Sequence, residues 1–222
     1  MTASIRFVLF DLDGTLVDSS PLHDHAFRVA ISALRPSRLA SFDYTPLRGL
    51  TTRDAFERLG EHDPDALDAL VAAKRAAFRA LAIRAFPGAI TLLSELARDG
   101  IRAFVVTSAA RASALATLRR TGLAPYVRGM IAAEDVSHGK PSPMPYLAAL
   151  KRFALRAHEG LAVEDAESGL GSARAAGLTV VRVHGAFDPR ERTAWAPDLD
   201  ALRVMLLQRR AVRATVARCR RT

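Results

Sequence analysis

Five short apolar runs recur along the chain, and each of them ends in polar residues. They lie at Ile5–Phe10, Ile101–Val106, Val127–Ala132, Leu161–Val163 and Thr179–Val183. Runs of this length between loop residues are typical of buried strands. Helical patterns separate the later runs, at Gly88–Arg98, Ala112–Thr121, Pro145–Phe153 and Ser168–Ala176. Strands that alternate with helices predict an α/β fold, with a Rossmann-like parallel sheet covered by helices on both faces.

Residues 18–85 interrupt this alternation, because they contain no convincing strand and much helical pattern. Helices are expected at Pro21–Leu34, from Thr51 through Leu59, and from Asp63 to about Arg84. Asp54 follows Thr51 at the spacing of a capping box. Asp63 is a helix cap residue followed by proline, which favours the first position of a helix. The pattern therefore predicts an α/β core formed by residues 1–17 and 86–202, with an inserted α-helical domain at 18–85.

Composition limits the classes of protein that fit. The chain has 222 residues, of which 50% are hydrophobic and 25% charged, as expected of a globular protein with one large domain or two modest ones. Cys219 is the single cysteine, so no disulfide can form within the chain. No apolar run approaches the 18 or so residues of a membrane-spanning helix. We expect a cytoplasmic protein that does not enter a membrane.

The net charge of +9 is concentrated at the C-terminus. Residues 203–222 contain seven arginines and no acid, and without them the net charge falls to +2. We expect this segment to be a basic C-terminal helix or tail exposed to solvent; packing of Val204 and Leu206 on the core is the alternative. Nucleic-acid binding through this segment is a remote alternative, since it has no aromatic residue for base stacking.

The most informative segment is Phe10–Ser19, with the sequence FDLDGTLVDS. It places Asp11 and Asp13 directly after a buried strand and immediately before Gly14. Open parallel sheets bind ligands beyond the carboxyl ends of their strands. Two carboxylates are costly to bury there without a cation or a chemical role. A polar turn followed by a helix cap at Asp18 is the alternative reading.

This segment resembles the first motif of the haloacid dehalogenase superfamily of phosphohydrolases. Three further segments resemble the other motifs of that family, in the expected order. They are Val105-Val106-Thr107-Ser108, Gly139-Lys140-Pro141-Ser142-Pro143, and Val163-Glu164-Asp165 followed by Gly169 and Ala175-Ala176-Gly177. The resemblance spans residues 5 to about 185. Its Glu-Asp pair is similar to the branch of sugar-phosphate phosphatases and β-phosphoglucomutases, although Ala166 stands where that branch often has serine.

The resemblance implies a role for each of four core residues. Asp11 would be the nucleophile that forms an aspartyl-phosphate. Asp13 would be the general acid and then the general base. Thr107 and Lys140 would hold the phosphoryl oxygens, with Ser108 as a further phosphate contact or as the alternative to Thr107. The presence of Asp13 favours phosphoryl transfer over dehalogenation, because a departing halide needs no proton.

The same resemblance implies a magnesium ion. A carboxylate and a phosphate repel each other, so a cation is required between them. Mg²⁺ would be held by Asp11, by the backbone carbonyl of Asp13 and by Asp165, with Glu164 as a ligand or as a partner of one.

The helical insert resembles the small cap domain of the family, which closes over the site. His23 and Arg48 are the expected substrate-binding residues of this cap, and His23 is also expected to position Asp13. Further candidates are Thr51, Thr52 and Lys74. The alternatives are that His23 is a surface or capping residue and that Lys74 belongs to a solvated helix face.

We therefore expect a Mg²⁺-dependent phosphatase that hydrolyses a small phosphorylated metabolite, such as a sugar or polyol phosphate. A phosphomutase of the β-phosphoglucomutase type is the alternative, because it would share every core residue. We expect no nucleic-acid partner and a monomer or homodimer.

Overall fold

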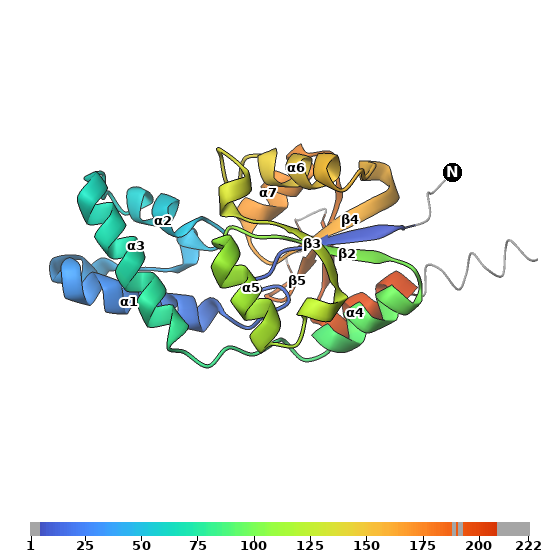
Figure 1. The fold of residues 1–222 in the computed structure, drawn as a ribbon, viewed down its shortest axis with the longest axis horizontal. Helices are drawn as coiled ribbons and strands as arrows, with labels where there is room; N and C mark the ends of the chain where they lie inside the picture. The colour runs from blue at the N-terminus through green and yellow to red at the C-terminus, as the bar shows by residue number, and fades with distance from the viewer. Residues whose placement is uncertain (1–4, 188–189, 191–192, 208–222) are drawn as a thin grey trace, which may run out of the picture.

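In the part of the chain that the structure describes, six parallel strands form one sheet in the order β3-β2-β1-β4-β5-β6 (Figure 1). The computed structural model describes residues 5–187, 190 and 193–207. The strands are β1 (Phe7–Phe10), β2 (Arg102–Val106), β3 (Val127–Ile131), β4 (Gly160–Glu164), β5 (Thr179–Val183) and β6 (Ala194–Ala196). The strand order reverses between β1 and β4, which is the position where doubly wound sheets bind their ligands. The predicted α/β fold with a Rossmann-like parallel sheet is confirmed.

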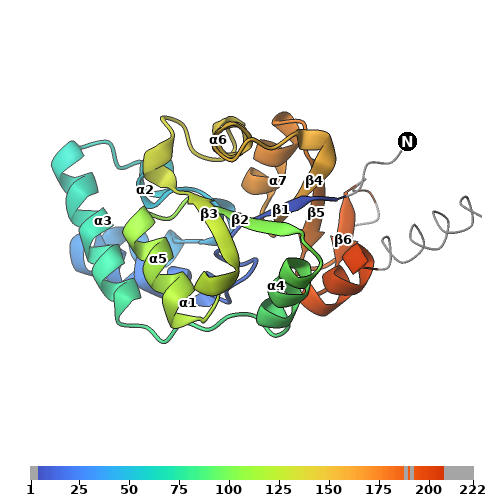
Figure 2. The same cartoon turned by 45° about the vertical axis from the view of Figure 1, so that its right-hand side comes forward.

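Both faces of the sheet are covered by helices, as Figure 2 shows. The helices of the core are α4 (Ala89–Arg98), α5 (Arg111–Arg120), α6 (Met144–Arg152) and α7 (Glu167–Ala175). Helices α6 and α7 cover one face, and α4, α5 and a helical stretch at 199–207 cover the other. Short 3₁₀ turns complete the core at Ala124–Tyr126, Ala133–Asp135 and Ala157–Glu159.

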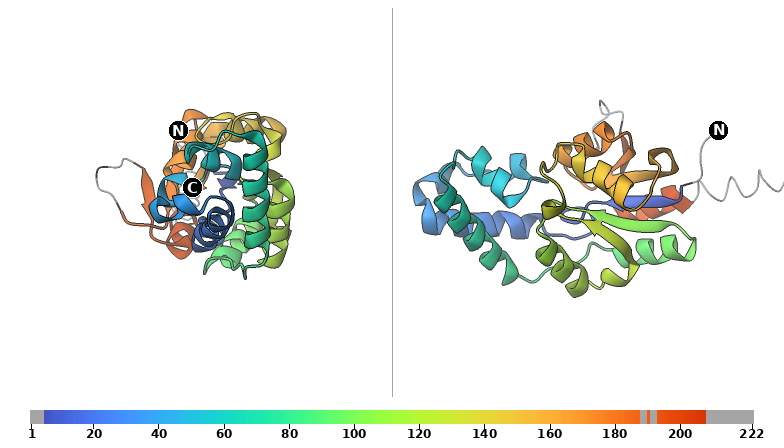
Figure 3. Two further views of the ribbon diagram at one scale, coloured as in Figure 1. Left: turned by 90° about the vertical axis from the view of Figure 1, so that its left-hand side faces the viewer. Right: turned by 45° about the horizontal axis from the view of Figure 1, so that its top comes forward.

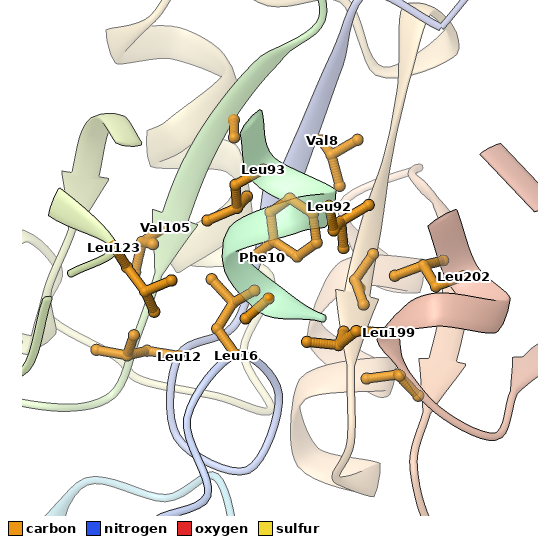
Figure 4. Close-up of a cluster of buried hydrophobic side chains, with 14 of the residues drawn as sticks. Val8, Phe10, Leu12, Leu16, Leu92, Leu93, Val105, Leu123, Leu199 and Leu202 are labelled. Carbon is orange, nitrogen blue, oxygen red and sulfur yellow. The ribbon is translucent and has the colours of Figure 1, made fainter. Parts of the chain in front are cut away.

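Strand β1 contributes side chains to both layers. Val8 and Phe10 point into the cluster formed with α4 and α5, while Phe7 and Leu9 point into the cluster formed with α6 and α7. All four are fully buried, because side chains of a strand alternate between its faces and here both faces are covered. Figure 4 shows Phe10 packed among Leu92 and other apolar side chains of the first cluster. This packing fixes the carboxyl end of β1, where Asp11 follows.

Residues 18–85, which we call the helical insert, lie beyond the carboxyl ends of the strands (Figures 1 and 3). The insert contains α1 (Ser20–Leu34), α2 (Thr52–Arg58), α3 (Pro64–Arg79) and 3₁₀ turns at Pro36–Ser41 and Thr45–Leu47. It has its own apolar cluster, which includes Phe27, Phe56 and Leu70. The side chains of Thr51 and Asp63 cap α2 and α3, as their sequence positions predict.

The two chain segments that join the insert to the core are hydrogen-bonded to each other. Asp18 N donates to Arg84 O at 3.0 Å, and Phe86 N donates to Leu16 O at 3.0 Å. The chain is therefore extended at Arg84, so the helix expected to continue to about that residue ends at Arg79 instead.

Two further features differ from the sequence-based expectations. Strand β6 was not expected, and within the described residues it pairs with β5 alone. The expected boundary at residue 202 falls inside the helical stretch 199–207, in which Leu199, Leu202 and Leu206 are buried against the core. The start of the basic segment thus packs on the core through Leu206, which is buried on the α4 side of the sheet, whereas Val204 is exposed. The arginines beyond 207 lie outside the described residues.

Among the described residues, no helix is both long enough and apolar enough to cross a bilayer.

Candidate active site

The strand order brings three sequence motifs to the carboxyl edge of the sheet. Asp11 follows β1, Glu164 ends β4, and Thr107 follows β2. Strands β2 and β4 are the two neighbours of β1, so these side chains lie around the end of the central strand. Asp165, the next residue after β4, completes the group.

Asp11, Glu164 and Asp165 form a buried group that we call the acidic cluster. Their nearest carboxylate oxygens all lie within 4.8 Å of one another. Lys140 reaches this group from the loop before α6, and its ammonium donates to Asp11 Oδ1 and to Glu164 Oε1, both at 2.6 Å. Lys140 is only 1% exposed. A lysine this deeply buried indicates that the carboxylates around it stabilise its charge.

Burial changes the proton affinity of all four groups. It raises the pKa of Asp11 well above its usual range, where Glu164 and Asp165 reinforce the shift and Lys140 opposes it. Burial also raises the pKa of Glu164 and of Asp165. Burial disfavours the charged form of Lys140, but Asp11 and Glu164 outweigh it and raise its pKa. The single positive charge of Lys140 does not neutralise the three carboxylates, so the acidic cluster favours the binding of a further cation.

A divalent cation fits this donor set. Magnesium prefers oxygen ligands and is usually held by one or two carboxylates. Gly14 makes room for one of them: it has a φ of +86°, and a Cβ there would lie 2.3 Å from Asp165 Oδ2. The acidic cluster accordingly contains three of the four residues expected to bind metal. The fourth residue, Asp13, was expected to bind the metal through its backbone carbonyl. Its carboxylate is not part of the acidic cluster and contacts Ser19 and His23 instead.

The carboxylate of Asp13 has separate partners. Ser19 Oγ donates to Asp13 Oδ1 at 2.7 Å, and His23 Nε2 lies 3.1 Å from the same oxygen. Lys74 Nζ lies 2.7 Å from His23 Nδ1. Because an ammonium can only donate, Nδ1 accepts, and the proton of the neutral imidazole is on Nε2, the ring nitrogen nearer to Asp13. Lys74 therefore acts on Asp13 through His23.

These contacts set the charge of Asp13. Burial alone would raise the pKa of Asp13, but His23 and Ser19 outweigh it and lower the pKa to about 2. Burial and the nearby Lys74 lower the pKa of His23, although Asp13 acts in the opposite direction. At neutral pH the arrangement holds an ionised Asp13 beside a neutral imidazole.

Thr107 and Ser108 differ in their contacts. Thr107 is 3% exposed, and its Oγ1 accepts a hydrogen bond from Ala109 N at 3.0 Å. Its own hydroxyl proton is therefore available to a ligand. Ser108 Oγ donates to Gly49 O in the insert at 2.7 Å, so its hydroxyl proton is already engaged.

A cleft of about 300 Å³ separates the helical insert from the core, and the site opens into it. Asp11, Asp13 and Thr107 line it from the core, and Arg48 and Lys74 line it from the insert. Thr51 and Thr52 also line the cleft. The guanidinium of Arg48 is paired with Asp165, so the insert directly contacts the acidic cluster.

Two side chains of the site were not singled out from the sequence. Ser19 ends the first motif, and its position there is the signal that could have identified it as a partner of Asp13. Tyr146 is fully buried on α6, and its hydroxyl donates to Glu164 Oε1. Nothing in the sequence distinguishes Tyr146 from an ordinary core aromatic residue.

Comparisons with known proteins agree with this geometry. Residues 8–183 match the sequence profile described as haloacid dehalogenase-like hydrolase. Hexitol phosphatase A of Escherichia coli (strain K12) is 36% identical over 183 residues, which cover 81% of this chain and 83% of the relative. Validoxylamine A 7'-phosphate phosphatase of Streptomyces hygroscopicus subsp. limoneus is 33% identical, with 79% and 84% covered.

A solved structure, CbbY from Rhodobacter sphaeroides in complex with phosphate, superposes with a TM-score of 0.74 at 26% identity. The match covers 88% of this chain and 95% of that one. The profile extends over all four motifs, from β1 to the end of β5, and the chain is therefore a member of the haloacid dehalogenase-like hydrolase family.

Proposed function

We propose that this chain is a magnesium-dependent phosphatase that hydrolyses a small phosphorylated metabolite, a sugar or polyol phosphate, through an aspartyl-phosphate. Two of its relatives are named for the phosphate esters of a hexitol and of validoxylamine A. The observation that carries the proposal is the separation of two neighbouring acids. Asp11 belongs to the acidic cluster with Lys140, whereas Asp13 is held by Ser19 and His23.

In the first step, a carboxylate oxygen of Asp11 attacks phosphorus, and the bond from phosphorus to the ester oxygen breaks. Asp13 gives a proton to the departing oxygen. This requires the protonated form of Asp13, and a phosphoryl dianion beside it favours that form by repulsion of like charges. Thr107 donates a hydrogen bond to a phosphoryl oxygen, and Lys140 supplies positive charge beside the phosphoryl group as its charge spreads.

In the second step, the ionised Asp13 takes a proton from water, and that water attacks the phosphorus of the aspartyl-phosphate. Inorganic phosphate leaves and Asp11 is regenerated. A pKa of about 2 keeps Asp13 in the basic form that this step needs. His23 and Lys74 orient the carboxylate throughout.

A bound magnesium ion would supply positive charge between Asp11 and the phosphate. Asp11, Asp165 and the carbonyl of Asp13 would hold it, with Glu164 in contact. The helical insert would act as the cap that excludes bulk water and contributes Arg48 to substrate binding.

The test measures release of inorganic phosphate from a panel of hexitol, pentose, hexose and glycolate phosphates, with Mg²⁺ and with EDTA. We expect metal-dependent release from at least one polyol or sugar phosphate and none from Asp11→Asn. Asp18→Asn is the matched control, because Asp18 is an exposed carboxylate of the same motif.

Equal activity in EDTA, or in Asp11→Asn, would contradict the proposal. Conversion of β-glucose 1-phosphate to its 6-phosphate without release of inorganic phosphate would instead identify the mutase.

A further inference from the structure

Two serines of the core donate hydrogen bonds to consecutive carbonyl groups of the helical insert. Ser168 Oγ donates to Arg48 O at 2.9 Å, and Ser108 Oγ donates to Gly49 O at 2.7 Å. The acceptors are neighbours in the loop between a 3₁₀ turn and α2, whereas the donors are far apart in the sequence. Two separate segments of the core, a loop and the first turn of a helix, thus bind one short piece of the insert.

The position of the two donors relative to the sheet is informative. Ser108 lies in the loop after β2, and Ser168 lies at the start of α7, which follows β4. Strands β2 and β4 flank β1 on its two sides. The two hydrogen bonds therefore straddle the end of the strand that carries Asp11.

The backbone of the loop is shaped for this contact. Gly49 has a φ of +78°, a conformation that L residues rarely adopt. A Cβ on Gly49 would lie 2.2 Å from Ser168 Oγ, so a side chain there would force either the Ser168 hydroxyl or the loop to move. Glycine thus allows both the close approach and the turn between the two carbonyls.

We propose that Ser108 and Ser168 form a clamp that holds the loop at Arg48 and Gly49 on the core, and that this clamp places the Arg48 side chain at the acidic cluster. Both serines are positioning residues: they bind the backbone of the insert and leave contact with the substrate to Arg48. This gives Ser108 a different role from the phosphate contact expected from the sequence. The kinetic consequence rests on the proposed phosphatase function, whereas the conformational consequence does not.

The clamp predicts how firmly the insert is held. An ordinary neutral hydrogen bond changes an equilibrium constant by about fivefold. Ser108→Ala and Ser168→Ala are each expected to lower the ratio of docked to released insert by about fivefold. The double variant is expected to lower it by about 25-fold, because the two serines contact different carbonyls.

The primary experiment measures the distance between two spin labels by pulsed electron paramagnetic resonance. Labels are placed on cysteines at Ala76 of α3 and Ala112 of α5, both exposed, in a Cys219→Ser background. Spectra are recorded in buffer and with saturating inorganic phosphate plus Mg²⁺. We expect the docked distance to lose population in both single variants, further in the double variant, and to be retained in Ser108→Thr, which keeps the hydroxyl.

Two matched controls separate the clamp from a general loss of structure. Ser94→Ala removes a serine hydroxyl bonded to a carbonyl within α4, away from the insert, and should not change the distances. Gly49→Ala should release the insert by a different route. Gly60→Ala carries a similar backbone strain at φ +85° but has open space around it, so the insert should remain docked.

An unchanged docked population in the double variant, or equal effects of Gly49→Ala and Gly60→Ala, would overturn the clamp. With the substrate found in the phosphate-release panel, the double variant should show kcat/KM lowered by about 25-fold, with most of the loss in KM. If no phosphate ester of the panel is hydrolysed, the spin-label distances still show whether the two serines hold the insert on the core. Failure of the clamp and failure of the proposed function are thereby distinguishable.

Discussion

Gly169 occupies the position where any side chain would collide with the carboxyl group of Glu164. A Cβ on Gly169 would lie 2.1 Å from Glu164 Oε2. Glu164 cannot easily move away, because its Oε1 already accepts hydrogen bonds from Lys140 and Tyr146. Because Gly169 has no side chain, α7 leaves room for the carboxyl group of Glu164 in the acidic cluster.

We expect Gly169→Ala to weaken Mg²⁺ binding at least tenfold and to destabilise the protein by about 1–3 kcal/mol, the usual cost of overpacking. Calorimetric titration with Mg²⁺ and thermal unfolding measure the two effects. Gly171→Ala is the control on the same helix, since a Cβ there meets nothing within 4 Å. It should stabilise the protein by about 0.5–1 kcal/mol through helix propensity. Equal metal affinity in the two variants would contradict this account of Gly169.

Removal of Lys140 should be costly because it leaves buried carboxylates without their cation. Lys140→Met is expected to lower the free energy of unfolding by about 3–5 kcal/mol. Mg²⁺ should restore part of this loss, since it supplies positive charge to Asp11 and its neighbours. Chemical denaturation with and without Mg²⁺ measures both effects. If Lys140→Met has the same denaturant midpoint as the parent protein, Lys140 does not compensate the negative charge of the acidic cluster.

The role of Asp13 can be tested with leaving groups of different basicity. Asp13→Asn cannot protonate the departing oxygen, so hydrolysis of an alkyl phosphate should fall by about 10²–10⁴-fold. Formation of the aspartyl-phosphate from an aryl phosphate should fall much less, because a phenolate leaves without a proton. Rapid-quench measurement of the first turnover isolates this step from later hydrolysis. Equal losses for both esters would rule out a general acid at this position.

Stability at alkaline pH should report the buried ammonium of Lys74. Burial lowers the pKa of Lys74 to about 8 from its usual 10.5, although Asp13 acts in the opposite direction. Between these values the unfolded chain binds more protons than the folded protein, so stability rises with pH. The contribution is on the order of 3 kcal/mol across that window.

The measurement for Lys74 is the free energy of unfolding between pH 7.5 and 11, compared with that of Lys74→Met. The difference between parent and variant should shift in favour of the parent as pH rises from about 8 to 10.5. Arg79→Met, an exposed position on the same helix, should retain the parent's pH dependence. Parallel curves for the parent and Lys74→Met would show that the ammonium is not held in a costly environment.

Local pattern was sufficient to predict most of the core. Strand β1 is apolar at every position because helices cover both faces of the sheet, and this makes it visible as a continuous run. Asp11, Glu164 and Lys140 could be grouped only through the family resemblance, since they are far apart along the chain. Strand β6 has three residues, too few to show a period.

The features that the sequence did not predict all depend on contacts between segments that are distant along the chain. The long helix of the insert ends at Arg79 because the backbone at Arg84 and Phe86 is needed for pairing with the other connection. Leu206 is buried because α4 presents an apolar surface to it, which a charge count over the C-terminal segment cannot reveal. The contact between Tyr146 and Glu164 likewise depends on where α6 packs, against β2, β3 and α7.

The pairing of the two connections also has a consequence for how such enzymes diversify. Val17 and Ala85 form a β-bridge, so the chain leaves and rejoins the core at adjacent points although 67 residues separate them. The insert thus occupies the place of a single loop between two adjacent points of the core. Insertions or deletions in this module can therefore leave the sheet register undisturbed, and the site at Asp13 is kept as long as Ser19, His23 and Lys74 retain their contacts.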